Sequence, residues 1–95
     1  MSKVNPWEVL NLRRKIKKFE TTGIVEAMKC LHRLRSLGLD RDMIIATEVS
    51  RTLIWACQRT KDNIKDEDKR KFNVMLRFLI KEYRKVLGVT EEKKE

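Results

Sequence analysis

The chain has 95 residues, of which 41% are apolar and 39% charged, and its formal net charge is +9 at pH 7. This length suits one small domain, and the apolar fraction is too high for an intrinsically disordered chain. Three glycines and one proline are too few for a β architecture with many turns. The positive surplus favours acidic partners, namely nucleic acid, an anionic membrane face or acidic protein segments.

Cys30 and Cys57 each lie within a helical pattern beside apolar neighbours. We therefore expect both to be small buried side chains of a protein in a reducing compartment. A secreted protein with a single disulfide is the alternative. The first residues lack the apolar core of a secretory signal, and no apolar run is long enough to cross a bilayer. We therefore expect a cytoplasmic or nuclear protein without a membrane partner.

The first helix is predicted over residues 6–17. Asn5 is the expected N-cap, Pro6 takes the first helical position, and Trp7 is a candidate anchor for the start of the helix. Residues 1–4 are expected to be disordered. The inward positions are Val9, Leu12 or Arg13, and Ile16. The helix ends in a basic run over residues 13–18, which is either a solvated face or a localisation signal or phosphate-binding patch.

The second helix is predicted over residues 23–37, because its apolar residues recur at the three-and-four spacing of one helix face. Thr22 or Gly23 can begin it, and Gly38 can end it. Residues 19–22 are expected to be an interhelical connection. The apolar stripe consists of Ile24, Ala27, Met28, Leu31, Leu34 and Leu37.

Three further helices are predicted. Asp40 is the expected cap of a short helix over residues 41–46, and Thr47 the expected cap of the next, in which Trp55 lies off the apolar stripe. The polar residues from 58 onward are expected to form a loop, after which Asp66 caps the longest helix and Gly88 ends it. That last helix has a broad stripe comprising Phe72, Met75, Leu76, Leu79, Tyr83, Val86 and Leu87, widened by Phe78 and Ile80.

The predicted fold is all-α, a compact bundle of four main helices plus one short helix. Residues 5–88 form the single domain, and residues 89–95 are an expected disordered, charged tail. Catalysis is not expected, because the chain lacks a glycine-rich phosphate loop and His32 is its only histidine. A zinc site from Cys30, His32 and Cys57 would lack a fourth ligand. We therefore expect no catalytic residues, no metal and no cofactor.

Three stretches carry a resemblance to a known family. They are Lys18-Phe19-Glu20 with the helix that follows, Thr47-Glu48 with Thr52-Leu53, and the long last helix with an aromatic residue near its start and a tyrosine near its end. Over roughly residues 8–87 the chain resembles the N-terminal domain family of transcription elongation factor TFIIS. The most similar branch is the integrase-binding domain of lens epithelium-derived growth factor and the hepatoma-derived growth factor-related proteins.

The resemblance implies a right-handed bundle, nuclear and monomeric, that binds disordered peptide segments of transcription and chromatin proteins. Partners in that branch present acidic residues and a phenylalanine to two interhelical loops. In the first loop, Glu20 would accept backbone N–H bonds and Phe19 would give an apolar contact. The second loop falls near residues 59–61, which are polar here, so Ile64 or Trp55 would have to supply its apolar contact. The expected partner-binding residues are Phe19, Glu20, Thr21, Arg59, Lys61 and Ile64.

The residues themselves also favour a binding module. A groove beside Phe19 would attract an acidic peptide if it were rimmed by Arg13, Arg14, Lys17 and Lys18. The competing interpretation of Phe19 is a core side chain. The alternative function is a nucleic-acid-binding domain that uses the basic first helix. A third possibility is a helical subunit of a larger complex, for which an exposed Trp55 would be the sign.

Overall fold

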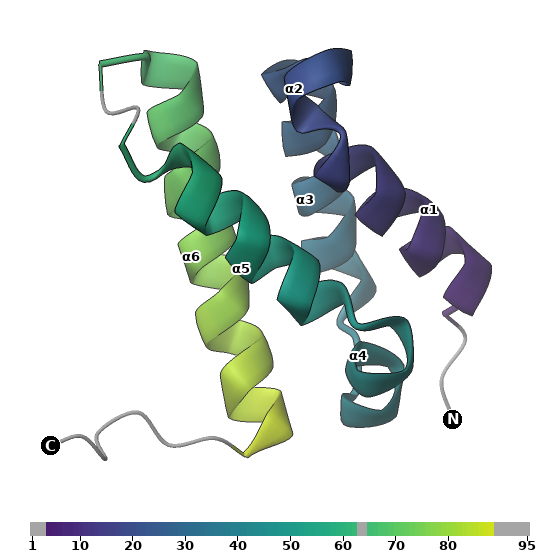
Figure 1. Ribbon diagram of the computed structural model, residues 1–95. Coiled ribbons are helices and arrows are strands. Elements are labelled where there is room, and N and C mark those ends of the chain that lie inside the picture. The colour runs from purple at the N-terminus through teal and green to yellow at the C-terminus, as the bar shows by residue number, and fades with distance from the viewer. Residues whose placement is uncertain (1–3, 63–64, 89–95) are drawn as a thin grey trace, which may run out of the picture.

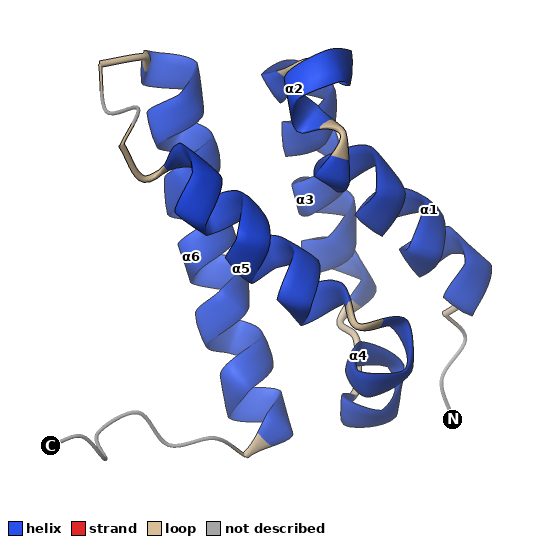
Figure 2. Ribbon diagram, viewed as in Figure 1, coloured by secondary structure: helices blue, strands red, loops and turns tan. Residues whose placement is uncertain are grey.

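The computed structural model describes residues 4–62 and 65–88, and within these ranges every regular element is a helix (Figures 1 and 2). This confirms the predicted all-α fold. The helices are α1 (Pro6–Lys17), α2 (Phe19–Thr22), α3 (Ile24–Leu37), α4 (Arg41–Thr47), α5 (Val49–Thr60) and α6 (Glu67–Leu87).

Most of the predicted helix ends are confirmed. The side chains of Asn5, Asp40 and Asp66 each accept hydrogen bonds from backbone N–H groups of the first turn, at 2.8 to 3.2 Å. These bonds satisfy donors that have no partner within the helix. Gly38 and Gly88 end α3 and α6 in the left-handed conformation, with φ of 59° and 82°.

Three boundaries differ from the prediction. Residues 19–22 form the short helix α2 instead of an irregular connection. Thr47 does not cap α5, because it is the last residue of α4 and its hydroxyl donates to the carbonyl oxygen of Met43 at 2.8 Å. Glu48 takes the cap position in a left-handed conformation, with φ of 55°. Residues 58–60, expected to lie in a loop, complete the last turn of α5.

The helices pack around one apolar core. α5 packs along α6, α1 lies against α3, and α3 also contacts α6. In Figure 1, α2 lies at the same end of the bundle as the start of α6, whereas α4 lies at the opposite end. The largest fully buried apolar side chains come from all six helices, and they include Val9, Ile16, Phe19, Leu31, Leu34, Ile44, Leu53, Phe72, Leu76 and Leu79.

Candidate functional site

Phe19, the apolar residue of the predicted site, is a core side chain. It is only 2% exposed, and its ring centroid lies 5.2 Å from that of Phe72 in α6 and 6.0 Å from that of Trp55 in α5. Tilted and edge-on contacts at these distances stabilise aromatic clusters. The ring therefore joins α2 to α5 and α6 and offers little surface to a partner, as the interpretation of a core phenylalanine predicts.

Glu20 and Arg59, which were assigned to the two halves of the site, contact each other. The Nη2 of Arg59 donates to both carboxylate oxygens of Glu20, at 3.0 and 3.2 Å, and its Nε donates to Oε2 at 3.3 Å. Both side chains are about half exposed. The guanidinium also lies over the ring of Trp55, with its Cζ 5.3 Å from the ring centroid. The surface formed by Glu20, Trp55 and Arg59 is called the α2/α5 site below.

The last turn of α5 places Arg59 at this site, and buried polar groups hold that turn in place. Thr60 is 2% exposed, and its hydroxyl donates to the carbonyl oxygen of Ala56 at 2.9 Å. The Nδ2 of Asn73 in α6 donates to Oγ1 of Thr60 at 2.9 Å and to the carbonyl oxygen of Cys57 at 3.0 Å. Because these polar groups are paired, the helix can continue across a stretch that looks like a loop in the sequence.

The remaining partner-binding candidates are spread around the α2/α5 site. Thr21 is exposed in α2, where its backbone N–H donates to the carbonyl oxygen of Lys18 at 2.9 Å. Lys61 is exposed and follows the last residue of α5. Ile64 lies outside the described residues. Trp55 is partly buried, so it, rather than Phe19, presents an aromatic surface here.

The basic residues predicted as an electrostatic rim have different surroundings. The Nε of Arg13 donates to the hydroxyl of Thr52 at 2.9 Å and thereby ties α1 to α5. Arg13, Arg14 and Lys17 line a depression of about 420 Å³ along α1, together with Trp7. Trp7 is 73% exposed, so the expectation that it anchors the start of the helix is wrong. Lys18 is exposed at the junction of α1 and α2.

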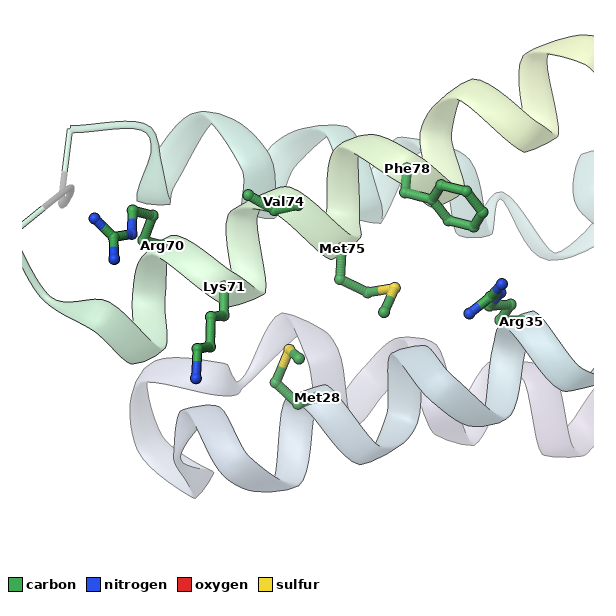
Figure 3. A pocket seen from close by; sticks show the side chains of 7 residues that line it. All are labelled: Met28, Arg35, Arg70, Lys71, Val74, Met75 and Phe78. Carbon is green, nitrogen blue, oxygen red and sulfur yellow. The ribbon is translucent and has the colours of Figure 1, made fainter.

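A second candidate surface lies between α3 and α6, where side chains of both helices surround a depression of about 520 Å³ (Figure 3). Its floor is apolar and consists of Met28, Val74, Met75 and Phe78. Its edges are basic, with Arg35 on α3 and Arg70 and Lys71 on α6.

The sequence pattern did not reveal this depression, because it placed Met28, Met75 and Phe78 on stripes expected to face the core. The stripe of α6 is wider than its helical neighbours cover, which leaves Phe78 40% exposed. Val25 and Val74, outside both stripes, are 63% and 59% exposed. The sequence did contain a signal for this surface, because Val25 and Val74 are apolar residues on the polar sides of their helices, where apolar residues indicate an exposed interaction surface.

The described residues hold no cluster of three or more histidine, cysteine, aspartate or glutamate side chains that could bind a metal ion. Cys30 and Cys57 are free thiols. Burial raises the pKa of the Cys30 thiol above its usual value, which lowers the fraction of the reactive thiolate. Among the helices within residues 4–62 and 65–88, none is both long and apolar enough to span a bilayer.

Searches against family models, curated proteins and solved structures found no match to this chain. The resemblance to the N-terminal domain family of TFIIS therefore stays a prediction. The fold and the two surfaces described above are the basis for the functional argument.

Proposed function

We propose that this chain is a non-catalytic protein-interaction module that binds short disordered segments carrying acidic and apolar side chains. The observation that carries the proposal is the α2/α5 site, where an exposed ion pair of Glu20 and Arg59 lies beside the partly buried ring of Trp55. The resemblance further suggests that the partners are transcription and chromatin proteins, and that the protein is nuclear and monomeric.

Each residue of the α2/α5 site has a role in this proposal. An acidic side chain of the partner pairs with Arg59, and an apolar side chain packs on the accessible part of Trp55. Glu20 accepts a backbone N–H bond of the partner through a carboxylate lone pair. An exposed ion pair contributes only about 0–1 kcal/mol to stability, so Glu20 and Arg59 can rearrange around the partner at small cost.

A charge swap tests the proposal without removing the ion pair. In the double variant Glu20→Arg and Arg59→Glu, the pair is restored with opposite polarity, so we expect the free energy of unfolding to change by less than about 1 kcal/mol. Binding of an acidic peptide that contains phenylalanine should fall at least about tenfold, because a carboxylate replaces the guanidinium that receives the acidic residue. Amide NMR titration measures both the affinity and the position of the contact.

The control is Glu48→Arg with Arg51→Glu, another exposed pair, at the start of α5. This swap should leave peptide affinity unchanged. Equal peptide binding by the wild type and the Glu20/Arg59 swap would refute the proposed α2/α5 site, and so would peptide-induced shifts confined to other helices.

The depression along α1 supports a second candidate function, binding of single-stranded nucleic acid. There the exposed ring of Trp7 lies with Arg14 and Lys17 around one depression, and an aromatic ring next to cations can stack a base while the cations contact phosphates. Trp7→Ala and Lys17→Glu should each weaken oligonucleotide binding in fluorescence anisotropy, with a steep dependence on salt. Binding that is unaffected by both changes would exclude this surface.

A further inference from the structure

The seam between α3 and α6 presents apolar side chains that the rest of the described chain covers only in part. The guanidinium of Arg35 lies over the ring of Phe78, with its Cζ 4.9 Å from the ring centroid. Met28 of α3 faces Met75 of α6 across the depression, and Val74 and Phe78 continue the apolar floor along α6 (Figure 3). Val74 and Phe78 are 59% and 40% exposed. Contiguous apolar surface of this kind marks interaction sites on soluble proteins.

Two neighbouring depressions extend this surface along the same seam. One shares Met28 with the first depression and reaches Ile24 and Val25 at the start of α3. The other shares Phe78 and reaches Val86 near the end of α6. The three depressions together are called the α3/α6 groove.

The edges of the α3/α6 groove carry mainly positive charge. Arg35, Arg70 and Lys71 line the central depression, whereas the acidic residues lie toward the two ends, with Asp68 at the start of α3 and Glu82 near the end of α6. Lys71 also pairs with Glu67, with 3.5 Å between Nζ and Oε2, but both side chains are about two-thirds exposed. Such a pair is weak and can open for a competing carboxylate.

We propose that the α3/α6 groove is a docking site for an amphipathic helix of another protein, whose apolar face enters the groove and whose edges carry acidic residues. From Ile24 to Arg35 the groove follows α3 for about 16 Å, the length of about three helical turns. Helices bind in this way by placing apolar residues from successive turns into a groove between other helices. The flexible side chains of Met28 and Met75 can adapt to the residues that enter.

The charge and the apolar floor of the groove favour an acidic amphipathic helix over a second copy of the chain or nucleic acid. A second copy of the chain would bring the same basic edges and a further +9 charge to the interface, and like charges at an interface oppose association. Nucleic acid would match the basic edges but would place its charged backbone over an apolar floor. An acidic amphipathic helix satisfies both parts of the surface.

The α3/α6 groove goes beyond the proposed function, because none of its lining residues belongs to the α2/α5 site. In Figure 1, α5 lies in front of α6 and α1 in front of α3, so the seam between α3 and α6 faces away from the viewer. The two sites can therefore be changed independently of each other.

The probe for the experiment is a synthetic peptide of about twelve residues, with leucines at helical spacing on one face and glutamates beside them. A scrambled peptide of the same composition is its control. The readout is the NMR signal of methionine methyl groups labelled with ¹³C. We expect the methyl signals of Met28 and Met75 to shift with the helical peptide, while that of Met43 in α4 stays unchanged.

Two substitutions on α6 complete the test. Val74→Glu places a negative charge on the floor at an exposed position, so it should reduce peptide affinity at least about tenfold without unfolding the helix. Arg77→Glu introduces the same side chain on the same helix outside the groove, and it should change affinity less than about threefold. Circular dichroism checks that both variants stay folded. The Glu20/Arg59 swap should bind this peptide as the wild type does, which separates this proposal from the α2/α5 site.

Several results would overturn the proposal: unchanged signals of Met28 and Met75, equal binding of the scrambled peptide, or equal effects of the two substitutions. Shifts of Met28 and Met75 that depend on protein concentration without peptide would overturn it in favour of a second copy of the chain. Stronger shifts of the same signals with duplex DNA than with the peptide would overturn it in favour of nucleic acid.

Discussion

Asn73 of α6 and Thr60 of α5 meet inside the protein, where the Nδ2 of Asn73 donates to the hydroxyl of Thr60 at 2.9 Å. Asn73 also donates to the carbonyl oxygen of Cys57 at 3.0 Å. These bonds hold the last turn of α5 against α6, and this turn carries Arg59. The buried pair therefore connects the interior of the bundle with the orientation of an exposed residue at the α2/α5 site.

Asn73→Ala should lower the free energy of unfolding by about 1–3 kcal/mol, because the carbonyl oxygen of Cys57 and the hydroxyl of Thr60 lose a buried donor. Urea denaturation measures this loss, and amide hydrogen exchange at Arg59 and Thr60 should become faster. The control, Asn11→Ala on the exposed side of α1, should change stability by less than about 0.5 kcal/mol. Equal stability of the two variants would contradict a structural role for the buried pair.

Glu48 joins α4 to α5 in a conformation that disfavours side chains, with φ of 55°. Glycine adopts this conformation without steric cost, whereas alanine retains the cost. Glu48→Gly should therefore be more stable than Glu48→Ala by about 1 kcal/mol. Both variants lose the exposed pair with Arg51, so thermal unfolding of the two isolates the effect of the backbone. Greater stability of the alanine variant would exclude strain at this position.

The buried hydroxyl of Tyr83 lacks a hydrogen-bond partner in the part of the chain that the structure describes. Burial raises the pKa of this phenol above its ordinary value of 10.0. As the pH rises past 10, the unfolded chain loses the phenolic proton before the folded protein does, so the folded protein becomes less stable relative to the unfolded chain.

Tyr83→Phe removes both the unpaired hydroxyl and this titration. At pH 7 the free energy of unfolding of the variant should equal that of the wild type or exceed it by up to about 1 kcal/mol. This difference should grow as the pH rises past about 10. Urea denaturation at pH 7, 9 and about 10.5 tests this. A constant loss of stability at every pH would instead indicate that the hydroxyl is hydrogen-bonded in solution.

The fold was predictable because strong local signals agreed with the apolar pattern. Asn5, Asp40 and Asp66 lie before three apolar stripes, and Gly38 and Gly88 follow two of them, so the caps and periodicities indicated the same helices. The last turn of α5 was missed because Thr60 and Asn73 are polar residues that become internal only once α6 is in place. Tertiary contacts of this kind are invisible to a local pattern.

The candidate sites were less predictable than the fold. The resemblance implied that the segments of Glu20 and Arg59 belong to one surface, and the structure places these side chains in contact. It could not indicate that this contact is an ion pair, since the position of Arg59 depends on the extra turn of α5. The α3/α6 groove was missed because periodicity assigns Met75 and Phe78 to a stripe but cannot tell how much of that stripe another helix covers.

Substitution of Phe19 should lower the stability of the domain, whereas substitution of its neighbour Glu20 should affect mainly partner binding. Its ring is 2% exposed, so Phe19→Ala should create a cavity and lower the free energy of unfolding by about 3–5 kcal/mol. Phe78→Ala removes the same atoms from a side chain that is 40% exposed, and it should have less than half of that effect. Glu20→Lys should cost less than about 1 kcal/mol, so it tests binding at the α2/α5 site without unfolding the domain. Equal losses for the two alanine variants in urea denaturation would contradict a core position for Phe19.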